Sequence, residues 1–351
     1  MTRKLASIQI VKNIQPINGA DRIEIATVLG WHVVVKKDEF KVGDKVIYFE
    51  IDSILPSDNT EFDFLKNSKG KISPLKTRRM MGVFSQGLIM PISILKSDIE
   101  PNEGDDLTEI LNIHKKEDEV IEVWCKKPKA FKQDTFPYFI PKTDEERIQN
   151  LQEELDEAKN HVFVVTEKLD GTSFTAYIKD GKFNICSRNM TVNQEVESPY
   201  SFISKKYDLE NKFKTLRELL GFDFAIQGEI IGPSIQKNKY ALTELDCYLF
   251  NLFNIDDQKH IGFNFDKGNS MFDLYKISEY LGMKTVPVLE PDFKMVNDID
   301  ALVDYSVGKS VLKHDQEREG VVFRLKNNEE LSHFGERISF KAINPYFLIK
   351  E

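Results

Sequence analysis

The stretch VFVVTEKLDGTS, residues 162–173, joins a β-branched run to a lysine, a carboxylate and a glycine. The run predicts a buried strand that ends near Lys168. Asp170 lies two residues further on, so both side chains share one side of an extended chain. If Lys168 is partly desolvated and close to other cations, its ammonium pKa falls and the free amine can attack phosphorus. Asp170 could then hold a metal ion or its waters, and Gly171 would let the backbone turn tightly under a phosphate or nucleoside.

The Lys-x-Asp-Gly spacing has a second interpretation. Three fixed letters recur often by chance, and a hairpin turn after an edge strand explains them equally well. The choice between covalent chemistry and a plain turn therefore depends on the rest of the chain.

Composition predicts a globular intracellular protein. The chain has 351 residues, of which 41% are apolar and 30% charged, and this length is enough for two domains. Cys125, Cys186 and Cys247 fit neither a disulfide framework nor a zinc spacing, so we expect a reducing cytoplasmic or nuclear location. We expect neither a secretory leader nor a membrane span. The net charge of −9 argues against nucleic-acid binding by the whole surface but allows a local basic groove.

Residues 1–112 are predicted to form a small Greek-key barrel with an OB-fold. Alternating apolar residues mark short strands at 5–10, 22–26, 31–35, 45–51 and 87–91. The loop KTRRMMGV, residues 76–83, places Arg78 and Arg79 beside this barrel. The loop is either an ordinary solvated segment or a surface that follows a phosphate backbone.

Residues 113–142 are predicted to be a linker, because the chain is acidic up to about residue 122 and then carries three prolines. Thr143 and Glu146 have the spacing of a capping box, which predicts a helix to about Asn160. Further helices are predicted at 202–220, 272–281 and 298–308. Strands are predicted at 181–189, 224–232, 247–255, 318–324 and 337–343.

Glu229 lies in the middle of the apolar strand 224–232. A carboxylate buried there requires a partner or a ligand. The two interpretations are a site residue and a salt bridge to a neighbouring strand.

Five short motifs occur in a fixed order along the second half of the chain: Lys168-Leu169-Asp170-Gly171, Gln227-Gly228-Glu229, Phe250-Asn251, Glu319-Gly320-Val321-Val322 and Phe340-Lys341. They resemble motifs I, III, IIIa, IV and V of the covalent nucleotidyltransferases, which include polynucleotide ligases and mRNA capping enzymes. Only ten residues follow Lys341, and the barrel comes first. Together with Ser187-Arg188-Asn189 and residues 142–150, this order resembles the ATP-dependent RNA ligases with an N-terminal OB-fold.

The resemblance implies an α+β chain. An OB-fold β-barrel would precede a nucleotidyltransferase (ATP-grasp-like ligase) domain, residues 143–351, of antiparallel sheets with helices. Lys168 would attack the α-phosphate of ATP and hold AMP covalently. Mg²⁺ or Mn²⁺, reached through water by Asp170 and Glu319, would lower the pKa of Lys168.

The remaining implied roles concern nucleotide and nucleic acid. Phe250 would stack on adenine with Val321 or Val322 beneath it, Glu229 and Arg188 would hold the ribose, and Lys341 would neutralise the α-phosphate. Glu167 is assigned to the nucleotide site as the neighbour of Lys168. Arg147 and Arg188 would contact substrate, as would Arg78 and Arg79 on the barrel. The implied substrate is RNA, or a duplex nicked with RNA on the 3′-OH side, with a 5′-phosphate and a 3′-OH end, and the protein is expected to be a monomer.

Two positions depart from the family pattern. Many relatives have Lys-x-Lys in motif V, whereas Ser339 precedes Lys341 here, so one phosphate contact either comes from Arg337 or is absent. Phe253-Asn254 is the alternative to Phe250-Asn251 for the stacking position. Two other functions also remain open: a capping-type guanylyltransferase that uses GTP, and a non-catalytic OB-fold protein that binds nucleic acid.

Overall fold

The computed structural model describes residues 3–95, 100–115, 131–262, 272–326 and 339–349. The chain divides by its internal contacts into two compact units. The first contains Met1–Glu117, Ile148–Gln152 and Pro345–Glu351, and the second contains Asp118–Arg147 and Glu153–Asn344. Arg337, Cys125 and residues 116–130, half of the predicted linker, lie outside the described residues. The domain limits at residues 112 and 143 stay predictions.

The first unit is built on a five-stranded antiparallel sheet with strand order β3-β2-β1-β4-β8. The first half of β1 pairs with β4 and its second half pairs with β2, with a register shift between Val11 and Asn13. Strand β4 is apolar on both faces: Val46 and Tyr48 pack in one cluster, and Ile47 and Phe49 in another. The strands are β1 (Ala6–Pro16), β2 (Ile23–Val28), β3 (Trp31–Lys36), β4 (Lys45–Phe49) and β8 (Leu88–Pro91).

The predicted basic loop of the first unit is a hairpin. Strands β6 (Arg78–Met80) and β7 (Val83–Ser85) pair around Met81 and Gly82, whose φ angles are 48° and 87°. Two consecutive left-handed residues are typical of a tight two-residue hairpin. Arg78 and Arg79 therefore lie on an exposed strand. The other elements here are β5 (Ser53–Ile54), η1 (Thr60–Leu65), η2 (Ile92–Ile94), β9 (His114–Lys115), η3 (Ile148–Asn150) and α8 (Pro345–Leu348).

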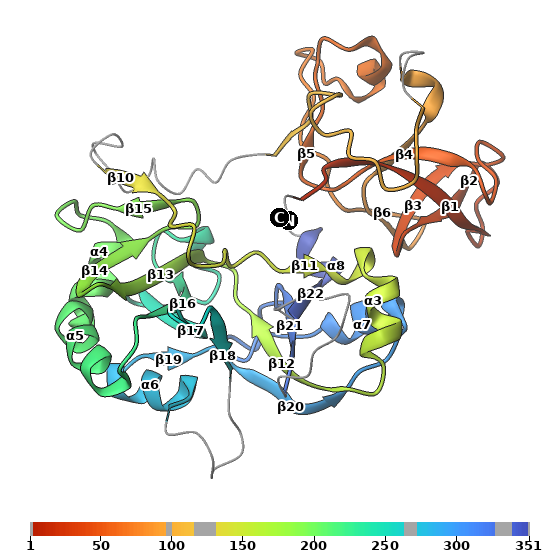
Figure 1. Cartoon of the computed structure of the whole chain (residues 1–351). Helices are drawn as coiled ribbons and strands as arrows, with labels where there is room; N and C mark the ends of the chain where they lie inside the picture. The colour runs from red at the N-terminus through yellow and green to blue at the C-terminus, as the bar shows by residue number, and fades with distance from the viewer. Residues whose placement is uncertain (1–2, 96–99, 116–130, 263–271, 327–338, 350–351) are drawn as a thin grey trace. The chain divides into compact units, whose positions relative to one another are not determined.

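The larger sheet of the second unit has the order β10-β15-β14-β13-β16-β17-β18, and β19 pairs in parallel with β17 (Figure 1). Helices α4, α5 and α6 pack their apolar residues against one face of it, with Phe213 and Phe224 in contact. Its strands are β10 (Lys132–Thr135), β13 (Thr172–Lys179), β14 (Lys182–Cys186), β15 (Met190–Val192), β16 (Phe224–Ile231), β17 (Asp246–Asn254), β18 (Lys259–Ile261) and β19 (Lys284–Thr285). The helices are α4 (Pro199–Lys206), α5 (Leu209–Leu220), η4 (Gln236–Asn238) and α6 (Leu274–Leu281).

The smaller sheet of the second unit has the order β11-β22-β21-β12-β20. Buried rings of Phe163, Phe323 and Phe340 pack together with centroids 5.4 to 5.6 Å apart. Its strands are β11 (Glu146–Arg147), β12 (Val162–Lys168), β20 (Val288–Lys294), β21 (Gly320–Leu325) and β22 (Ser339–Ile343), and the helices near it are α3 (Gln152–Ala158) and α7 (Ile299–Ser306).

The predicted helix from Thr143 to Asn160 is wrong over its first half. Residues 146–147 form β11, which pairs in parallel with β22, and only Gln152–Ala158 is α-helical. The capping-box pattern is local, whereas the strand pairing with Phe340 and Lys341 comes from nearly 200 residues away and overrides it. The predicted helix 202–220 is two helices, α4 and α5, separated at Asp208 with a φ of 50°. Helix α5 ends at Gly221, whose φ of 78° suits a glycine cap.

No helix in the described part of the chain combines the length and apolarity needed to cross a membrane.

Candidate active site

Strand β12 places Lys168 inside a sheet and not at its edge. β12 is paired on one side with β20 and on the other with β21, where Lys168 lies opposite Gly320. The interpretation of this stretch as a hairpin after an edge strand is therefore wrong. A Cβ added to Gly320 would lie 2.2 Å from the carbonyl oxygen of Ala342, so only glycine allows the two backbones to approach this closely.

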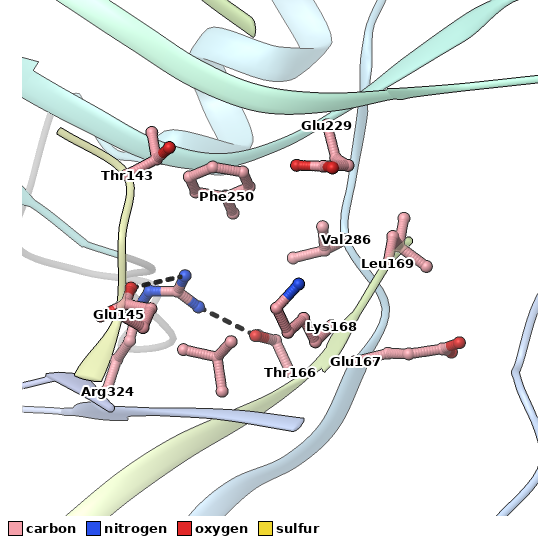
Figure 2. A pocket seen from close by; sticks show the side chains of 11 residues that line it. Thr143, Glu145, Thr166, Glu167, Lys168, Leu169, Glu229, Phe250, Val286 and Arg324 are labelled. Atoms are coloured by element: carbon pink, nitrogen blue, oxygen red, sulfur yellow. Dashed lines mark hydrogen bonds and ion pairs between the residues drawn. The ribbon is translucent and has the colours of Figure 1, made fainter. Parts of the chain in front are cut away.

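A cavity opens beside Lys168, and residues from both sheets of the second unit line it (Figure 2). The Lys168 amine points into the space between Phe250, Glu229 and Thr166, whereas Glu167 points away (Figure 2). The carboxylate of Glu167 accepts a hydrogen bond of 2.8 Å from the backbone of Val311. The lining residues are Thr143, Glu145, Thr166, Glu167, Lys168, Leu169, Glu229, Phe250, Val286, Val322 and Arg324.

The Lys168 amine is held by carboxylates. Its Nζ donates a hydrogen bond of 2.7 Å to Oε1 of Glu319, which lies 151 residues further along the chain. Desolvation lowers the pKa of Lys168, but Glu319, Glu229 and Asp170 outweigh it and raise the pKa above its ordinary value. The expected lowering of the Lys168 pKa depends on nearby cations, whereas the protein groups beside the amine are negative, so the lowering by a divalent cation stays a prediction.

Glu229 projects from β16 toward the turn that follows Lys168. One carboxylate oxygen accepts a hydrogen bond of 3.1 Å from the Gly171 amide, and no salt bridge to a neighbouring strand is found among the described residues. Desolvation raises the pKa of Glu229 to about 8, although Lys168 opposes the shift. Gly171 allows this contact by close approach and not by an unusual φ angle, since a Cβ there would lie 2.2 Å from the Ile230 carbonyl oxygen.

Asp170 and Glu319 are the pair of carboxylates predicted to bind a metal. Desolvation raises the pKa of Asp170 to about 7, with Glu319 adding to the shift and Lys239 opposing it. Glu319 Oε2 is buried and has no hydrogen-bond partner in the described part of the chain. The described residues contain no cluster of three His, Cys, Asp or Glu ligands. Two carboxylates with an unused oxygen fit a hydrated Mg²⁺ or Mn²⁺, which needs few protein ligands.

These pKa shifts predict the pH dependence of stability. Asp170 and Glu229 have folded-state pKa values of about 7 and about 8, above their ordinary values of 3.8 and 4.5. The folded protein therefore binds more protons, and the stability from that binding is lost as the pH rises through 7 and 8. In EDTA, melting followed by circular dichroism should show falling stability from about pH 5 to pH 8.5.

Asp170→Asn and Glu229→Gln should each flatten this decline, because neither replacement titrates in that range. Glu218→Gln, an exposed site on α5, is the matched control and should keep the wild-type slope. If both cavity variants lost stability with rising pH as steeply as the wild type does, the raised pKa values assigned to Asp170 and Glu229 would be contradicted.

The cavity lining includes an aromatic side chain that can stack on the flat ring of a nucleobase. Phe250 lines it, whereas Phe253 packs in a separate apolar cluster with Tyr177, so the structure favours Phe250 for stacking. The prediction named Val321, with Val322 as the alternative, and Val322 is the residue that lines the cavity. Val321 lies opposite Glu167, on the side of the sheet that faces away.

Arg324 is the main lining residue that sequence reasoning missed. Its guanidinium lies 5.6 Å from the centre of the Phe250 ring and donates to Thr166 Oγ1 at 2.9 Å and to Glu145 at 3.5 Å. Its position two residues after Val322 in a strand places both side chains on one face, which is a signal the sequence contained. No comparable signal pointed to Glu145 or Thr166.

The predicted cations lie in three places. Arg147, Lys341, Val322 and Thr166 are successive cross-strand neighbours, so they form a row on one face of the smaller sheet, although the first two do not line the cavity. Arg188 lies beyond β14, where its guanidinium pairs with Asp144. Arg78 and Arg79 belong to the first unit.

Two family comparisons divide the chain in the same order as the two predicted parts. Residues 5–92 match an OB-fold domain, and residues 161–343 match the RNA ligase family. The chain belongs to the RNA ligase family. The predicted N-terminal OB-fold, the α+β class and the resemblance to RNA ligases are confirmed.

Solved structures of an RNA ligase from Naegleria gruberi resemble the whole chain. A variant solved with AMP and Mn and another with ATP and Mn each have a TM-score of 0.83, 33% identity and coverage of 99% of both chains. The structure with PPi has a TM-score of 0.82 at 33% identity, covering 100% of this RNA ligase and 99% of the other chain. No curated protein matches the sequence.

Proposed function

We propose that this RNA ligase uses ATP to form a covalent lysyl-AMP on Lys168 and then joins a 5′-phosphate end to a 3′-OH end. The observation that carries the proposal is the position of the Lys168 amine, which points into a cavity walled by Phe250 and bordered by Glu229 (Figure 2). The Naegleria relatives solved with ATP, AMP and Mn support this choice of nucleotide and metal.

In the first step the Lys168 amine attacks the α-phosphorus of ATP. A phosphorus–nitrogen bond forms, the bond to the bridging oxygen breaks, and pyrophosphate leaves. Glu319 Oε1, at 2.7 Å, orients the amine and can accept its proton. A divalent cation held through water by Asp170 and Glu319 would supply the positive charge that lowers the Lys168 pKa and neutralises the phosphate.

The other residues bind the nucleotide. Phe250 stacks on the adenine with Val322 on the opposite side, while Glu229 and Arg188 hold the ribose. Lys341 contacts the α-phosphate, and its cross-strand neighbour Arg147 contacts a further phosphate of ATP or RNA. Glu167 stabilises the backbone next to Lys168, because its carboxylate accepts a hydrogen bond from the Val311 amide.

In the later steps AMP passes from Lys168 to the 5′-phosphate, and the neighbouring 3′-OH displaces it. The substrate class is RNA, or a duplex nicked with RNA on the 3′-OH side, as in RNA repair. Residues 1–112 would bind nucleic acid, 113–142 would link the domains, and 143–351 would carry the chemistry. The protein is a monomer in this proposal, and its cysteines, which fit no disulfide framework, favour the cytoplasm or nucleus.

A labelling experiment tests the proposal. The protein is incubated with α-labelled ATP or GTP and magnesium, and covalent label is read after denaturing electrophoresis. ATP should label the protein. Label from GTP alone would favour a capping-type guanylyltransferase, and no label from either would favour a non-catalytic OB-fold protein.

The Arg78 and Arg79 hairpin gives a prediction for nucleic-acid binding. Both side chains are exposed. The Arg79 guanidinium lies 5.7 Å from the centre of the Phe84 ring, so this aromatic contact helps to hold the exposed positive charge in place. Arg78→Gln with Arg79→Gln should weaken binding of a nicked duplex and reduce the slope of log K against log salt by about 2, because two phosphate contacts are lost.

The matched control for this pair is Lys69→Gln with Lys71→Gln, which removes two exposed charges from another loop of the first unit. For this control variant, the slope of log K against log salt should equal that of the wild type. An unchanged slope in the arginine variant would show that the hairpin does not contact the phosphate backbone.

A further inference from the structure

The loop that joins β16 to β17 is held in an unusual backbone conformation. Five of its non-glycine residues have positive φ angles, a conformation that L-residues seldom adopt without support. These residues are Ser234, Gln236, Lys237, Asn238 and Ala241. So many disfavoured residues in one short loop indicate that the surroundings fix its shape.

Packing and hydrogen bonds supply that support. Ile235 and Tyr240 are buried in the core of the larger sheet. The Asn238 side chain donates to the Leu242 carbonyl oxygen at 2.9 Å and accepts from the Leu242 amide at 3.1 Å. These contacts support the unusual backbone conformation of the loop.

Three side chains of the loop between β16 and β17 contact the turn that follows Lys168. Tyr240 accepts a hydrogen bond of 2.7 Å from the Asp170 amide, and Gln236 donates to the Gly171 carbonyl oxygen at 3.4 Å. Lys239 Nζ lies 2.5 Å from Asp170 Oδ2, and the two side chains are only 16% and 13% exposed. Water screens an ion pair at this depth poorly, so removing one partner would leave the other charge buried and uncompensated.

The charges around Asp170 explain why a lysine is held there. Lys168 pairs with Glu319, and Lys239 pairs with Asp170. Glu229 adds a further acidic group, close enough to interact electrostatically with both Lys168 and Asp170. None of the family motifs in the sequence contains Lys239. Its ammonium occupies the carboxylate oxygen that the proposed function assigns to a hydrated metal ion.

We propose that Lys239 is the built-in counter-ion of the metal-free site and that a divalent cation binds by displacing its ammonium from Asp170. This inference rests on the metal assignment in the proposed function. Because the cation must compete with Lys239, the site binds metal weakly by itself. The negative phosphates of ATP shift the competition toward the metal, so the metal is loaded together with the nucleotide.

The test is Mn²⁺ binding to the full-length, nucleotide-free protein, measured by calorimetry. Lys239→Met keeps the apolar stem and removes the charge, and it should bind Mn²⁺ about tenfold more tightly than the wild type. Asp170→Asn should lose this binding. Lys237→Met, an exposed lysine of the same loop that also has a positive φ angle, is the matched control and should bind as the wild type does.

A second measurement separates competition from a structural ion pair. In EDTA, Lys239→Met should melt below the wild type, and saturating Mn²⁺ should restore more of its melting temperature than it adds to the wild type. Equal losses with and without Mn²⁺, or an unchanged or weaker Mn²⁺ affinity, would overturn the inference. Lys239→Gln, which keeps a hydrogen bond to Asp170 without the charge, gives the same comparison if the methionine variant does not fold.

Mn²⁺ binding by the nucleotide-free protein is independent of the ligase assignment. Because no nucleotide is present, the result does not depend on whether Lys168 accepts AMP. If Asp170→Asn binds Mn²⁺ as well as the wild type does, the metal site is wrongly placed and the inference is overturned with it.

Discussion

Lys168→Ala and Lys168→Arg should both lose covalent labelling by ATP, by more than about a thousandfold, because no other group can replace the attacking amine. The arginine variant is informative because its guanidinium keeps the positive charge between Glu319 and Glu229 but stays protonated and is a poor nucleophile. The measurement is the rate of label incorporation from α-labelled ATP with magnesium.

Lys159→Ala, an exposed lysine just after α3, is the control and should label at the wild-type rate. Circular dichroism shows whether each variant is folded. Label that persists in folded Lys168→Ala would reject Lys168 as the nucleophile and, with it, the proposed covalent mechanism.

Glu319→Gln and Glu319→Ala should reduce adenylylation by about a hundredfold to a thousandfold while the protein remains folded. Glu319 has two separable tasks, since Oε1 orients the Lys168 amine and Oε2 has no hydrogen-bond partner among the described residues. Glu319 is also the main charge that raises the pKa of Lys168. Its removal alone would free more neutral amine and speed the attack, so a loss of rate would point to positioning and metal binding.

Glu317→Gln is the matched control, because Glu317 is a partly buried carboxylate two residues away that pairs with Lys309. It should adenylylate at nearly the wild-type rate. If Glu319→Gln instead lost melting temperature in proportion to activity, Glu319 would be a structural partner of Lys168 and the metal assignment would fail.

Three acidic residues raise the pKa of Lys168 above its ordinary value. Glu319, Glu229 and Asp170 keep the amine protonated, and a protonated amine cannot attack ATP. The proposed mechanism therefore uses the positive charge of a divalent cation to lower the pKa of Lys168. The proposed displacement of Lys239 is similar. Lys168 pairs with Glu319 and Lys239 pairs with Asp170, and in both cases a bound metal ion would take over part of the neutralisation of the carboxylate.

The sequence by itself determined the parts of this protein that depend on local pattern. Alternating apolar residues located the strands of the barrel and of the second unit, and Gly221 marked the end of α5. The ordered motifs identified an RNA ligase and selected Lys168, Glu229, Phe250 and Glu319. These features can be recognised in the sequence because strand periodicity, helix caps and short motifs each depend on residues that are close together in the chain.

Only the tertiary structure decided which distant residues meet. It paired Arg147 with Lys341 in place of a predicted helix, placed Val322 and not Val321 at the cavity, and surrounded Lys168 with carboxylates that raise its pKa. It also brought Lys239 to Asp170 from a loop with no motif of its own. Strand register and burial are set by contacts between segments many residues apart, and a one-residue change in register exchanges the two faces of a strand.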